Sequence, residues 1–350
     1  MPTTHTLDDN WSELRVSDDA RNDPGELRRR LDRDGYLFFR RLQDPDRLRA
    51  LRREMLTVMQ EGGWLAAGTD PVDGIANLES RCTEGDVEYT DVYHRVYKLE
   101  SFHRSAHRPE VLGLVERILG KPAMPHPQKI ARLWFPQYTE HTTPAHQDFV
   151  HFQGNFQTLT CWAPVGDCPR ELGGLAILAG SHKTGKVLTH HFSLGAGALD
   201  VELGDKERIR EWHSTDYKIG DTLIFPALTI HKALPNLTED RLRVSLDNRY
   251  QAIGDPIAEH MLLPHMHIYN QLSWEDVYRG WESDDLKYYW ESIENPILPR
   301  DMSYLDQGFE EAVSLAQSGD AHAQLYLARF IKRDPESSQA RAAKTALEGR

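Results

Sequence analysis

Cysteine is scarce in this chain, and the few that occur are poorly placed for structural chemistry. The 350 residues include three cysteines, Cys82, Cys161 and Cys168. No two of them have the C-x-x-C spacing typical of thiolate zinc sites, and an odd, sparse set argues against a disulfide framework. We therefore expect small buried thiols and no cysteine among the functional residues.

Long apolar runs are absent too. No stretch approaches the ~18–20 consecutive apolar residues that span a bilayer, so we expect no membrane segment. The first residues lack the basic and apolar regions of a signal peptide, which predicts a cytoplasmic protein. Hydrophobic residues make up 39% of the chain and charged residues 27%, which is typical of a globular protein. The length suits one large domain with a full core, or one domain plus an appendage.

Positive charge is also in short supply. The formal net charge is -13, and such a surface repels phosphate backbones, so we expect no nucleic-acid partner. Residues 93–108 are a local exception, because they gather basic and aromatic side chains. We interpret them as a solvated face, in preference to a cationic lip for an anionic substrate.

The spacing of apolar residues divides the chain into three parts. Residues 1–24 are polar and without periodicity, which predicts a loose N-terminal arm. Residues 25–295 are expected to form the main domain. Its helices are predicted over 26–34, 45–61 and 109–119. From about residue 128, short β-type runs alternate with Gly, Asp and Pro-Asn turns, which favours a sandwich or barrel over a parallel βαβ sheet.

Two segments depart from the strand pattern. The insert 183–214 contains Gly195-Ala196-Gly197 and is interpreted either as a lid over a site or as a decorated loop. Residues 296–350 are predicted to form a helical C-terminal appendage that weakly resembles half of a Sel1-type repeat. Its small residues are expected where helices touch: Ala312, Ala316, Gly319, Ala323 and Ala328. We expect this tail to be a packing element or a homo-oligomer contact.

Three residues form a candidate metal site. His146 and Asp148 lie two positions apart, so both point to one face of an extended segment. With 17 histidines and 54 acidic residues in the chain, this spacing alone is not informative. Its position at the start of the β-rich region is informative, and His231 follows a later turn and strand. Together the three predict a 2-His-1-carboxylate face that leaves positions open on an octahedral iron.

A candidate anion anchor lies on the following strand. Arg243 and Ser245 share one strand face, and a guanidinium with a hydroxyl can grip a carboxylate. The alternative is a surface arginine paired with Asp247. Arg241 and Arg249 have the same strand parity, so parity alone does not choose among the three arginines.

The remaining histidines are weaker candidates. His141, His151, His190, His191 and His213 are expected at the surface, although His151 is also placed to face a substrate cavity. The tandem pair 190–191 cannot point to one face of a strand.

Residues from about 25 to 255 resemble the phytanoyl-CoA dioxygenase-like family of Fe(II)/2-oxoglutarate oxygenases. The resemblance rests on the following motifs: D-G-Y-L-F-F-R at 34–40, P-A-H-Q-D at 144–148, Asp167, G-G-L at 173–175, G-S-H at 180–182, and G-D-x-L-x-F…H…P-N from 220 to 236. One departure is Ala179, where the family often has proline before G-S-H.

The resemblance implies an α+β protein with a double-stranded β-helix (jelly-roll) core, flanking helices and a helical C-terminal tail. It implies Fe(II) held by His146, Asp148 and His231, with 2-oxoglutarate and O2 as co-substrates. The co-substrate contacts that it implies are Arg243, Ser245, Trp162 and Gln128. Related halogenases replace the metal-binding carboxylate with a small residue, so the presence of Asp148 disfavours halogenation.

The implied activity is oxidation, most simply hydroxylation, of a C–H bond in a small-molecule substrate, with release of succinate and CO2. Two other classes stay open. A cupin-type metalloenzyme without 2-oxoglutarate would not need Arg243, and a non-catalytic binding protein on a vestigial barrel would not bind Fe(II). The sequence does not indicate the substrate, and we expect specificity to reside in 64–108 and in the 183–214 insert.

Overall fold

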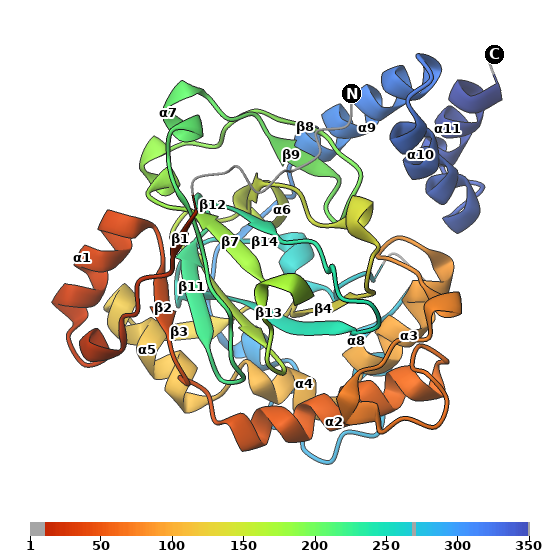
Figure 1. The fold of residues 1–350 in the computed structure, drawn as a ribbon. Coiled ribbons are helices and arrows are strands. Elements are labelled where there is room, and N and C mark those ends of the chain that lie inside the picture. The colour runs from red at the N-terminus through yellow and green to blue at the C-terminus, as the bar shows by residue number, and fades with distance from the viewer. Residues whose placement is uncertain (1–10, 268–270, 349–350) are drawn as a thin grey trace.

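Two β-sheets lie face to face at the centre of the molecule (Figure 1). The structure is a computed structural model that describes residues 11–267 and 271–348. The first sheet has the strand order β1 (Trp11–Glu13), β10 (Trp212–Ser214), β7 (Leu175–Leu178), β12 (Ile230–Ala233) and β5 (His146–Gln147). The second has the order β2 (Leu37–Phe39), β11 (Thr222–Pro226), β6 (Leu159–Pro164), β13 (Arg243–Ala252) and β3 (Ala123–Pro125), and β4 (Ile130–Trp134) also pairs with β13.

The chain crosses repeatedly between these sheets. Strands β4, β6, β11 and β13 belong to the second sheet, and β5, β7 and β12, which lie between them in the sequence, belong to the first. This alternation winds the chain into a double-stranded β-helix, so the predicted jelly-roll core is confirmed. Strand β13 is buried along its whole length, because it pairs with β6 on one side and with β3 and β4 on the other.

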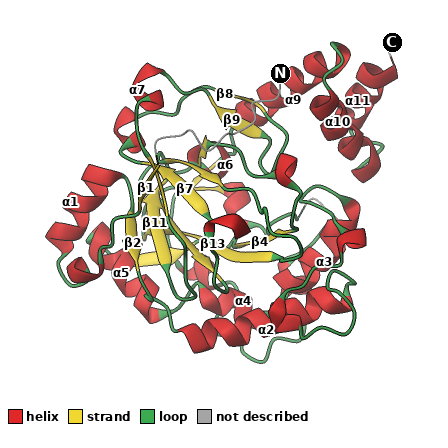
Figure 2. Cartoon of the chain, viewed as in Figure 1, coloured by secondary structure: helices red, strands yellow, loops and turns green. Residues whose placement is uncertain are grey.

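Helices cover the second sheet, as Figure 2 shows in red around the yellow strands. They are α1 (Pro24–Asp34), α2 (Pro45–Glu61), α3 (Val87–Tyr97), α4 (Glu100–Ser105) and α5 (Pro109–Leu119). Their ends follow local signals. The side chains of Asp23 and Asp44 accept backbone N–H groups at the starts of α1 and α2. Gly35 and Gly120, in left-handed conformation, end α1 and α5.

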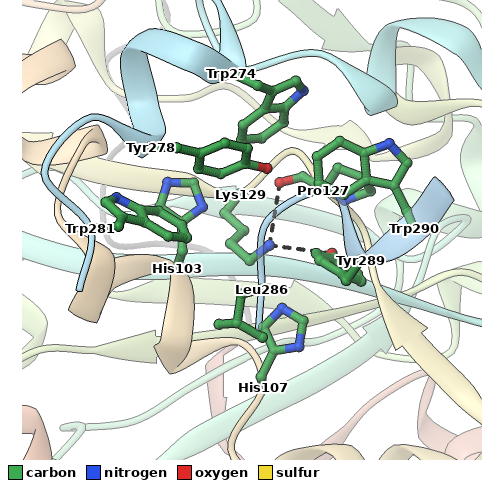
Figure 3. A pocket seen from close by; sticks show the side chains of 10 residues that line it. All are labelled: His103, His107, Pro127, Lys129, Trp274, Tyr278, Trp281, Leu286, Tyr289 and Trp290. Atoms are coloured by element: carbon green, nitrogen blue, oxygen red, sulfur yellow. Dashed lines mark hydrogen bonds between the residues drawn. The ribbon is translucent and has the colours of Figure 1, made fainter. Parts of the chain in front are cut away.

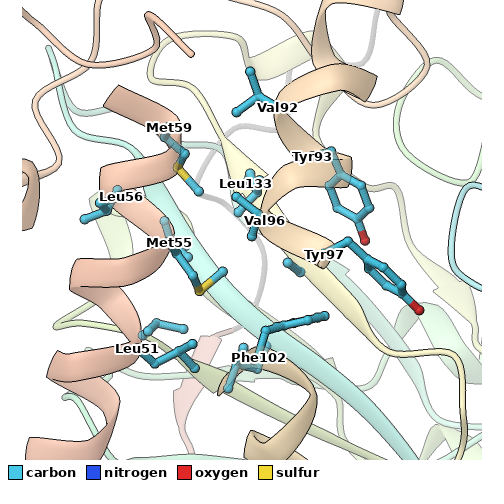
Figure 4. Packing of buried hydrophobic residues seen from close by; sticks show 14 of the residues in the cluster. Leu51, Met55, Leu56, Met59, Val92, Tyr93, Val96, Tyr97, Phe102 and Leu133 are labelled. Atoms are coloured by element: carbon cyan, nitrogen blue, oxygen red, sulfur yellow. The ribbon is translucent and has the colours of Figure 1, made fainter. Parts of the chain in front are cut away.

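The largest apolar cluster joins these helices to the sheet (Figure 4). Met55 and Met59 of α2 face Val96 of α3, and Leu133 of β4 closes the cluster from the sheet side. Met55 is fully buried. Truncating such a side chain to alanine typically costs about 2–5 kcal/mol of stability, so this cluster fixes the helical layer firmly on the barrel.

The insert 183–214 is ordered. It contains a hairpin of β8 (His190–Phe192) and β9 (Leu199–Val201), then the short helix α7 (Asp205–Arg208), and it ends in β10 of the first sheet. The C-terminal third begins with β14 (Ile257–Ala258), which pairs in parallel with β15 (Ile297–Leu298), and α8 (Trp274–Tyr278) lies between them in the sequence.

The tail consists of three helices, α9 (Ser303–Gln317), α10 (Ala321–Arg333) and α11 (Ser338–Glu348). Of the small residues expected at helix contacts, Ala312, Ala316 and Ala323 are fully buried, whereas Gly319 and Ala328 are exposed. The tail packs on the main domain through α9 and the β8–β9 hairpin (Figure 1).

The N-terminal segment differs from the expected loose arm. Residues 11–13 form β1, which pairs in parallel with β10 at the edge of the first sheet. Residues 1–10 lie outside the described part of the chain. Among the residues that the structure describes, no helix has the length and apolarity that crossing a membrane requires.

Candidate metal centre

His146, Asp148 and His231 meet inside the barrel, and one potential ligand atom of each lies within 4.8 Å of the others. Strands β5 and β12 pair so that His146 lies directly opposite His231. The Oδ1 atom of Asp148 is 3.4 Å from Nε2 of His146 and 3.6 Å from Nε2 of His231. All three side chains are buried. The predicted residues are therefore brought together around one point.

Both imidazoles are oriented by the same device. Nδ1 of His146 is 2.8 Å from the carbonyl oxygen of Pro144, and Nδ1 of His231 is 3.0 Å from that of Thr229. Each Nδ1–H donates to a carbonyl, which leaves Nε2 as the lone-pair nitrogen facing Asp148. Burial lowers the pKa of His231 to about 4, so its ring stays neutral. Two imidazole nitrogens and one carboxylate suit a divalent first-row metal such as Fe(II).

Asp148 is held by two residues of the second sheet. It lies in right-handed helical conformation at the start of α6 (Phe149–Phe152), so the extended segment ends one residue earlier than predicted. Thr160 of β6 donates a short hydrogen bond to Oδ2, and Arg249 of β13 lies 3.4 Å from Oδ1. Burial alone would raise the pKa of the Asp148 carboxyl, but Arg249 and the two histidines together bring it well below its usual value.

Arg243 is a buried cation without an acidic partner. Its Nη1 donates to the Ser245 hydroxyl at 2.6 Å, and its guanidinium lies over the ring of Trp134. Within the described chain no carboxylate lies within 4.0 Å of it, and its Nε has no hydrogen-bond partner. Burial lowers the pKa of Arg243 to about 10, so it stays charged at neutral pH and lacks a buried counter-ion.

The alternative pairing of Arg243 with Asp247 does not occur. Asp247 is 3.0 Å from Arg249 and 3.4 Å from Arg132. Arg241 is exposed and donates to the carbonyl of Asp73. Of the three arginines that share strand parity, only Arg243 is both buried and without an acidic partner.

The other predicted co-substrate contacts lie in two places. Trp162 is buried beside Arg243, and its Nε1 donates to Ser245 at 3.2 Å. Gln128 lies elsewhere, at the wall of the main cavity. Its amide donates to the carbonyls of His260 and Leu263, so this group holds the backbone. The roles assigned to Arg243, Ser245, Trp162 and Gln128 stay predictions.

A cavity of about 330 Å³ opens from His146 and Asp148. This volume lies at the lower end of the range of small-molecule sites. Residues 195–198 of the insert line one side, and His151 also lines it. A lid role for the insert stays a prediction. The tail helices line the far side with Phe309, Tyr326 and Phe330 among others.

Several histidines expected at the surface are buried instead. His141, His190 and His213 are at most 5% exposed. His213 bonds to Tyr36, 2.7 Å from its hydroxyl. The Nε2 of His190 accepts the backbone N–H of Gln147 and so steadies β5. Burial dominates the low pKa of His190, about 4.

The basic stretch 93–108 is a solvated face only in part. The side chains of Arg95 and Arg104 are 37% and 39% exposed, whereas His94, His103 and Arg108 are buried. His103 and His107 pack with the aromatic residues beyond 270 around the buried Lys129 (Figure 3). The Lys129 ammonium donates to the carbonyls of His126 and Pro127 and lies 3.4 Å from the Tyr289 hydroxyl. Burial lowers the pKa of Lys129 to about 7. Side chains fill this pocket, so the aromatic residues serve packing.

The sequence pattern did not single out several site residues. The only sequence signal for Thr160 and Arg249 is strand parity. Thr160 shares it with Trp162, and Arg249 shares it with Arg243. The tail residues of the cavity wall lie far along the chain, and no local pattern connects them to the metal site.

Comparison with known proteins supports this description. A model of the phytanoyl-CoA dioxygenase (PhyH) family matches residues 31–244, which is more than half of the chain. Over 260 residues the chain is 27% identical to the 1-deoxypentalenic acid 11-beta-hydroxylase of Streptomyces arenae, covering 69% of this chain and 86% of that protein.

Two solved structures are also similar. The epimerase SnoN in complex with Fe3+, alpha ketoglutarate and nogalamycin RO gives a TM-score of 0.47 at 20% identity, over 66% of this chain and 86% of that one. EctD from S. alaskensis gives 0.49 at 18% identity, over 73% and 85%.

Proposed function

Because the chain belongs to the phytanoyl-CoA dioxygenase family of Fe(II)- and 2-oxoglutarate-dependent oxygenases, we propose that it hydroxylates a C–H bond of a small-molecule substrate. The observation that carries the proposal is the convergence of His146, Asp148 and His231 at the inner end of a cavity. Iron held there, with 2-oxoglutarate and O2, supplies the oxidising power, and succinate and CO2 are the co-products.

The side chains around the site position its ligands. The carbonyls of residues 144 and 229 fix the tautomer and the ring planes of the two histidines. Thr160 and Arg249 fix the carboxylate. A ligand set held in advance loses little entropy when the metal binds, and such outer contacts typically raise metal affinity by about 10–100-fold.

Arg243 supports the use of 2-oxoglutarate. A buried guanidinium without a carboxylate partner is costly unless a ligand supplies the anion. Ser245 already contacts Arg243 and Trp162, so a carboxylate arriving there gains charge-assisted hydrogen bonds from a preformed group. The far carboxylate of 2-oxoglutarate fits this role, which a cupin-type enzyme without that co-substrate does not require.

Hydroxylation is favoured among the oxidative outcomes. Asp148 occupies the position that related halogenases leave open, and the relative from Streptomyces arenae is a hydroxylase by name. The cytoplasmic location and a homo-oligomer built through the tail stay predictions.

The test is anaerobic addition of Fe(II) and 2-oxoglutarate to the metal-free protein. We expect the weak visible charge-transfer band of the chelated complex in the wild type and its loss in His231→Ala. His191→Ala is the matched control, since His191 is half-buried and lies outside the cluster, and this variant should keep the band.

Each other outcome supports a different protein class. Bound iron without a band on addition of 2-oxoglutarate would indicate a metalloenzyme that does not use this co-substrate. No iron binding at all would indicate a non-catalytic protein on the same barrel.

A further inference from the structure

The tail completes the cavity that starts at the metal site. Met302 and Leu305 at the start of the tail, Phe309 of α9 and Phe330 of α10 line it, and so does Phe152 of α6. These apolar side chains favour an apolar ligand body. The tail lies beyond residue 244, where the family match ends.

The same cavity is rich in cations. Four arginines line it, Arg132, Arg300, Arg329 and Arg333, against two carboxylates, Glu84 and Asp148. The whole chain carries a net charge of -13, so this concentration of positive charge runs against the composition. A cavity lined mainly by one sign of charge attracts ligands of the other sign.

Two of these arginines are occupied by neighbouring carboxylates. Arg132 is 2.6 Å from Glu84, and Arg329 is 3.0 Å from Asp86. Their charges are balanced inside the protein, and their geometry serves to hold the loop around residue 85 in place. Arg333 stacks on the ring of Phe330 at 4.4 Å.

Arg300 is different. It lies between β15 and the tail and is half-buried, and its Nε–H has no hydrogen-bond acceptor. Within the described residues no carboxylate lies within 4.0 Å of its guanidinium. Glu259 is near, but its carboxylate accepts the backbone N–H of Arg300 at 3.1 Å. A guanidinium in this situation is preorganised for a carboxylate or similar oxyanion.

We infer that the substrate is an organic acid with an apolar body, whose anionic group binds Arg300 while its carbon skeleton contacts Phe309 and Phe330. The inference rests on the proposed function for the reaction, but it assigns substrate recognition to the tail.

A pair of dyes tests this without knowledge of the substrate. Anilinonaphthalene sulfonate carries an anionic group on an apolar body, and N-phenylnaphthylamine has the same body without the charge. Both become fluorescent in apolar sites. We expect Arg300→Met to weaken binding of the sulfonate dye by about tenfold or more and to leave binding of the neutral dye unchanged. Arg300→Lys should restore part of the lost affinity.

Two controls locate the effect. Arg53→Met changes an exposed arginine of α2 and should alter neither dye. Leu305→Trp fills the cavity and should weaken both dyes. Circular dichroism and thermal unfolding confirm that each variant is folded.

The contrary results are distinct. Equal weakening of both dyes by Arg300→Met, or no weakening of either, would overturn the assignment of the anion site. Dye binding that Leu305→Trp leaves unchanged would place the ligand outside this cavity. Dye binding needs no iron, so the two tests are independent. A failed dye test contradicts this inference alone, and a missing charge-transfer band contradicts the proposed function.

Discussion

Three histidine side chains at or near the metal site are oriented by the backbone carbonyl two residues earlier in the chain. His146, His190 and His231 each direct Nδ1 to the carbonyl of the residue two positions earlier. This local bond fixes which nitrogen bears the proton. In two of the three cases Nε2 then faces Asp148, and in the third it accepts a backbone N–H. One local motif thus serves both metal binding and strand positioning.

The hydrogen bond from Thr160 to Asp148 should be needed for tight metal binding. We expect Thr160→Val to lower the affinity for Fe(II) by about 10–100-fold, because the carboxylate loses a contact that orients it. Thr158→Val is the matched control, since the Thr158 hydroxyl is buried without a hydrogen-bond partner. Anaerobic metal titration measures both, and equal affinities in the two variants would contradict the positioning role.

Arg243 should govern the co-substrate. Arg243→Ala removes the only buried guanidinium on that strand that has no acidic partner, so the half-saturating concentration of 2-oxoglutarate should rise by about tenfold or more. Arg241→Ala, two residues earlier and exposed, should leave it unchanged. Titration of the charge-transfer band compares the variants. A loss of affinity in Arg241→Ala but not in Arg243→Ala would show that Arg241, and not Arg243, anchors the co-substrate.

At this scale the sequence was informative for the metal site and ambiguous for the anchor. The three metal-site residues could be predicted because strand spacing and motif context agree. Arg241, Arg243 and Arg249 could not be separated by parity, since the difference among them is which carboxylate each one meets in space. The surface assignment of His141, His190 and His213 was wrong, because a polar residue's burial depends on partners that a linear pattern does not display.

Turns between elements hold the strands that carry the ligands. Gly173 has a φ of +88°, and a Cβ there would lie 2.5 Å from the carbonyl oxygen of Leu234. Leu234 in turn donates to Gly174. The G-G-L turn therefore packs directly on the backbone that leaves β12, three residues after His231.

Alanine substitution at two glycines should change the stability of the protein in opposite directions. Gly173→Ala should destabilise the protein by about 2 kcal/mol or more, because it combines a left-handed conformation with a backbone clash. Gly113→Ala, inside α5 with no atom within 4 Å of the added Cβ, should stabilise it by about 0.5–1 kcal/mol. Thermal unfolding gives the order of the midpoints. The reverse order would contradict the structural description of this turn.

Elements were predictable where a local signal repeats. The helices α2 and α5 and the strands β4, β6, β11 and β13 follow apolar periodicity bounded by Gly or Pro. Strand β1 was missed because its three residues depend on pairing with β10, about two hundred positions later in the chain. Asp148 leaves the strand one residue early because α6 begins at the next residue, Phe149.

The whole molecule joins a family core to a tail that the family match does not include. Contacts between them are polar as well as apolar: Lys332 pairs with Glu88, and Glu311 accepts the backbone N–H of Phe192. Phe192 packs on Tyr326. The tail is thereby held against the mouth of the cavity.

Disrupting the packing of the tail helices should weaken ligand binding in the cavity and leave the metal site intact. Ala323→Asp places a charge where α9 and α10 touch, so the tail should lose its packing and become sensitive to proteolysis. The band with Fe(II) and 2-oxoglutarate should persist, whereas binding of the sulfonate dye should fall. Ala328→Asp on the exposed face of α10 should change neither. Unaltered dye binding in Ala323→Asp would show that the tail is not part of the site.

The cavity wall was beyond the reach of sequence reasoning. Arg300 and Phe330 have no periodic or motif relation to residues 146–148, and the packing of α9 on β8 and of α10 on α9 brings the tail to the same cavity. The tail was interpreted as a packing element or an oligomer contact, and its place over the site follows from tertiary contacts alone.

That the cavity is walled by the last helices of the chain has a consequence for biosynthesis. A ribosome makes the residues of the metal site well before it releases α10 and α11, and domains generally fold in the order of synthesis. The barrel with its three ligands can therefore form while the substrate chamber still lacks a side. A chain that ends before the tail would therefore have a complete metal centre that is open to solvent. Because its barrel is folded, protein quality control would not recognise it as an unfolded chain.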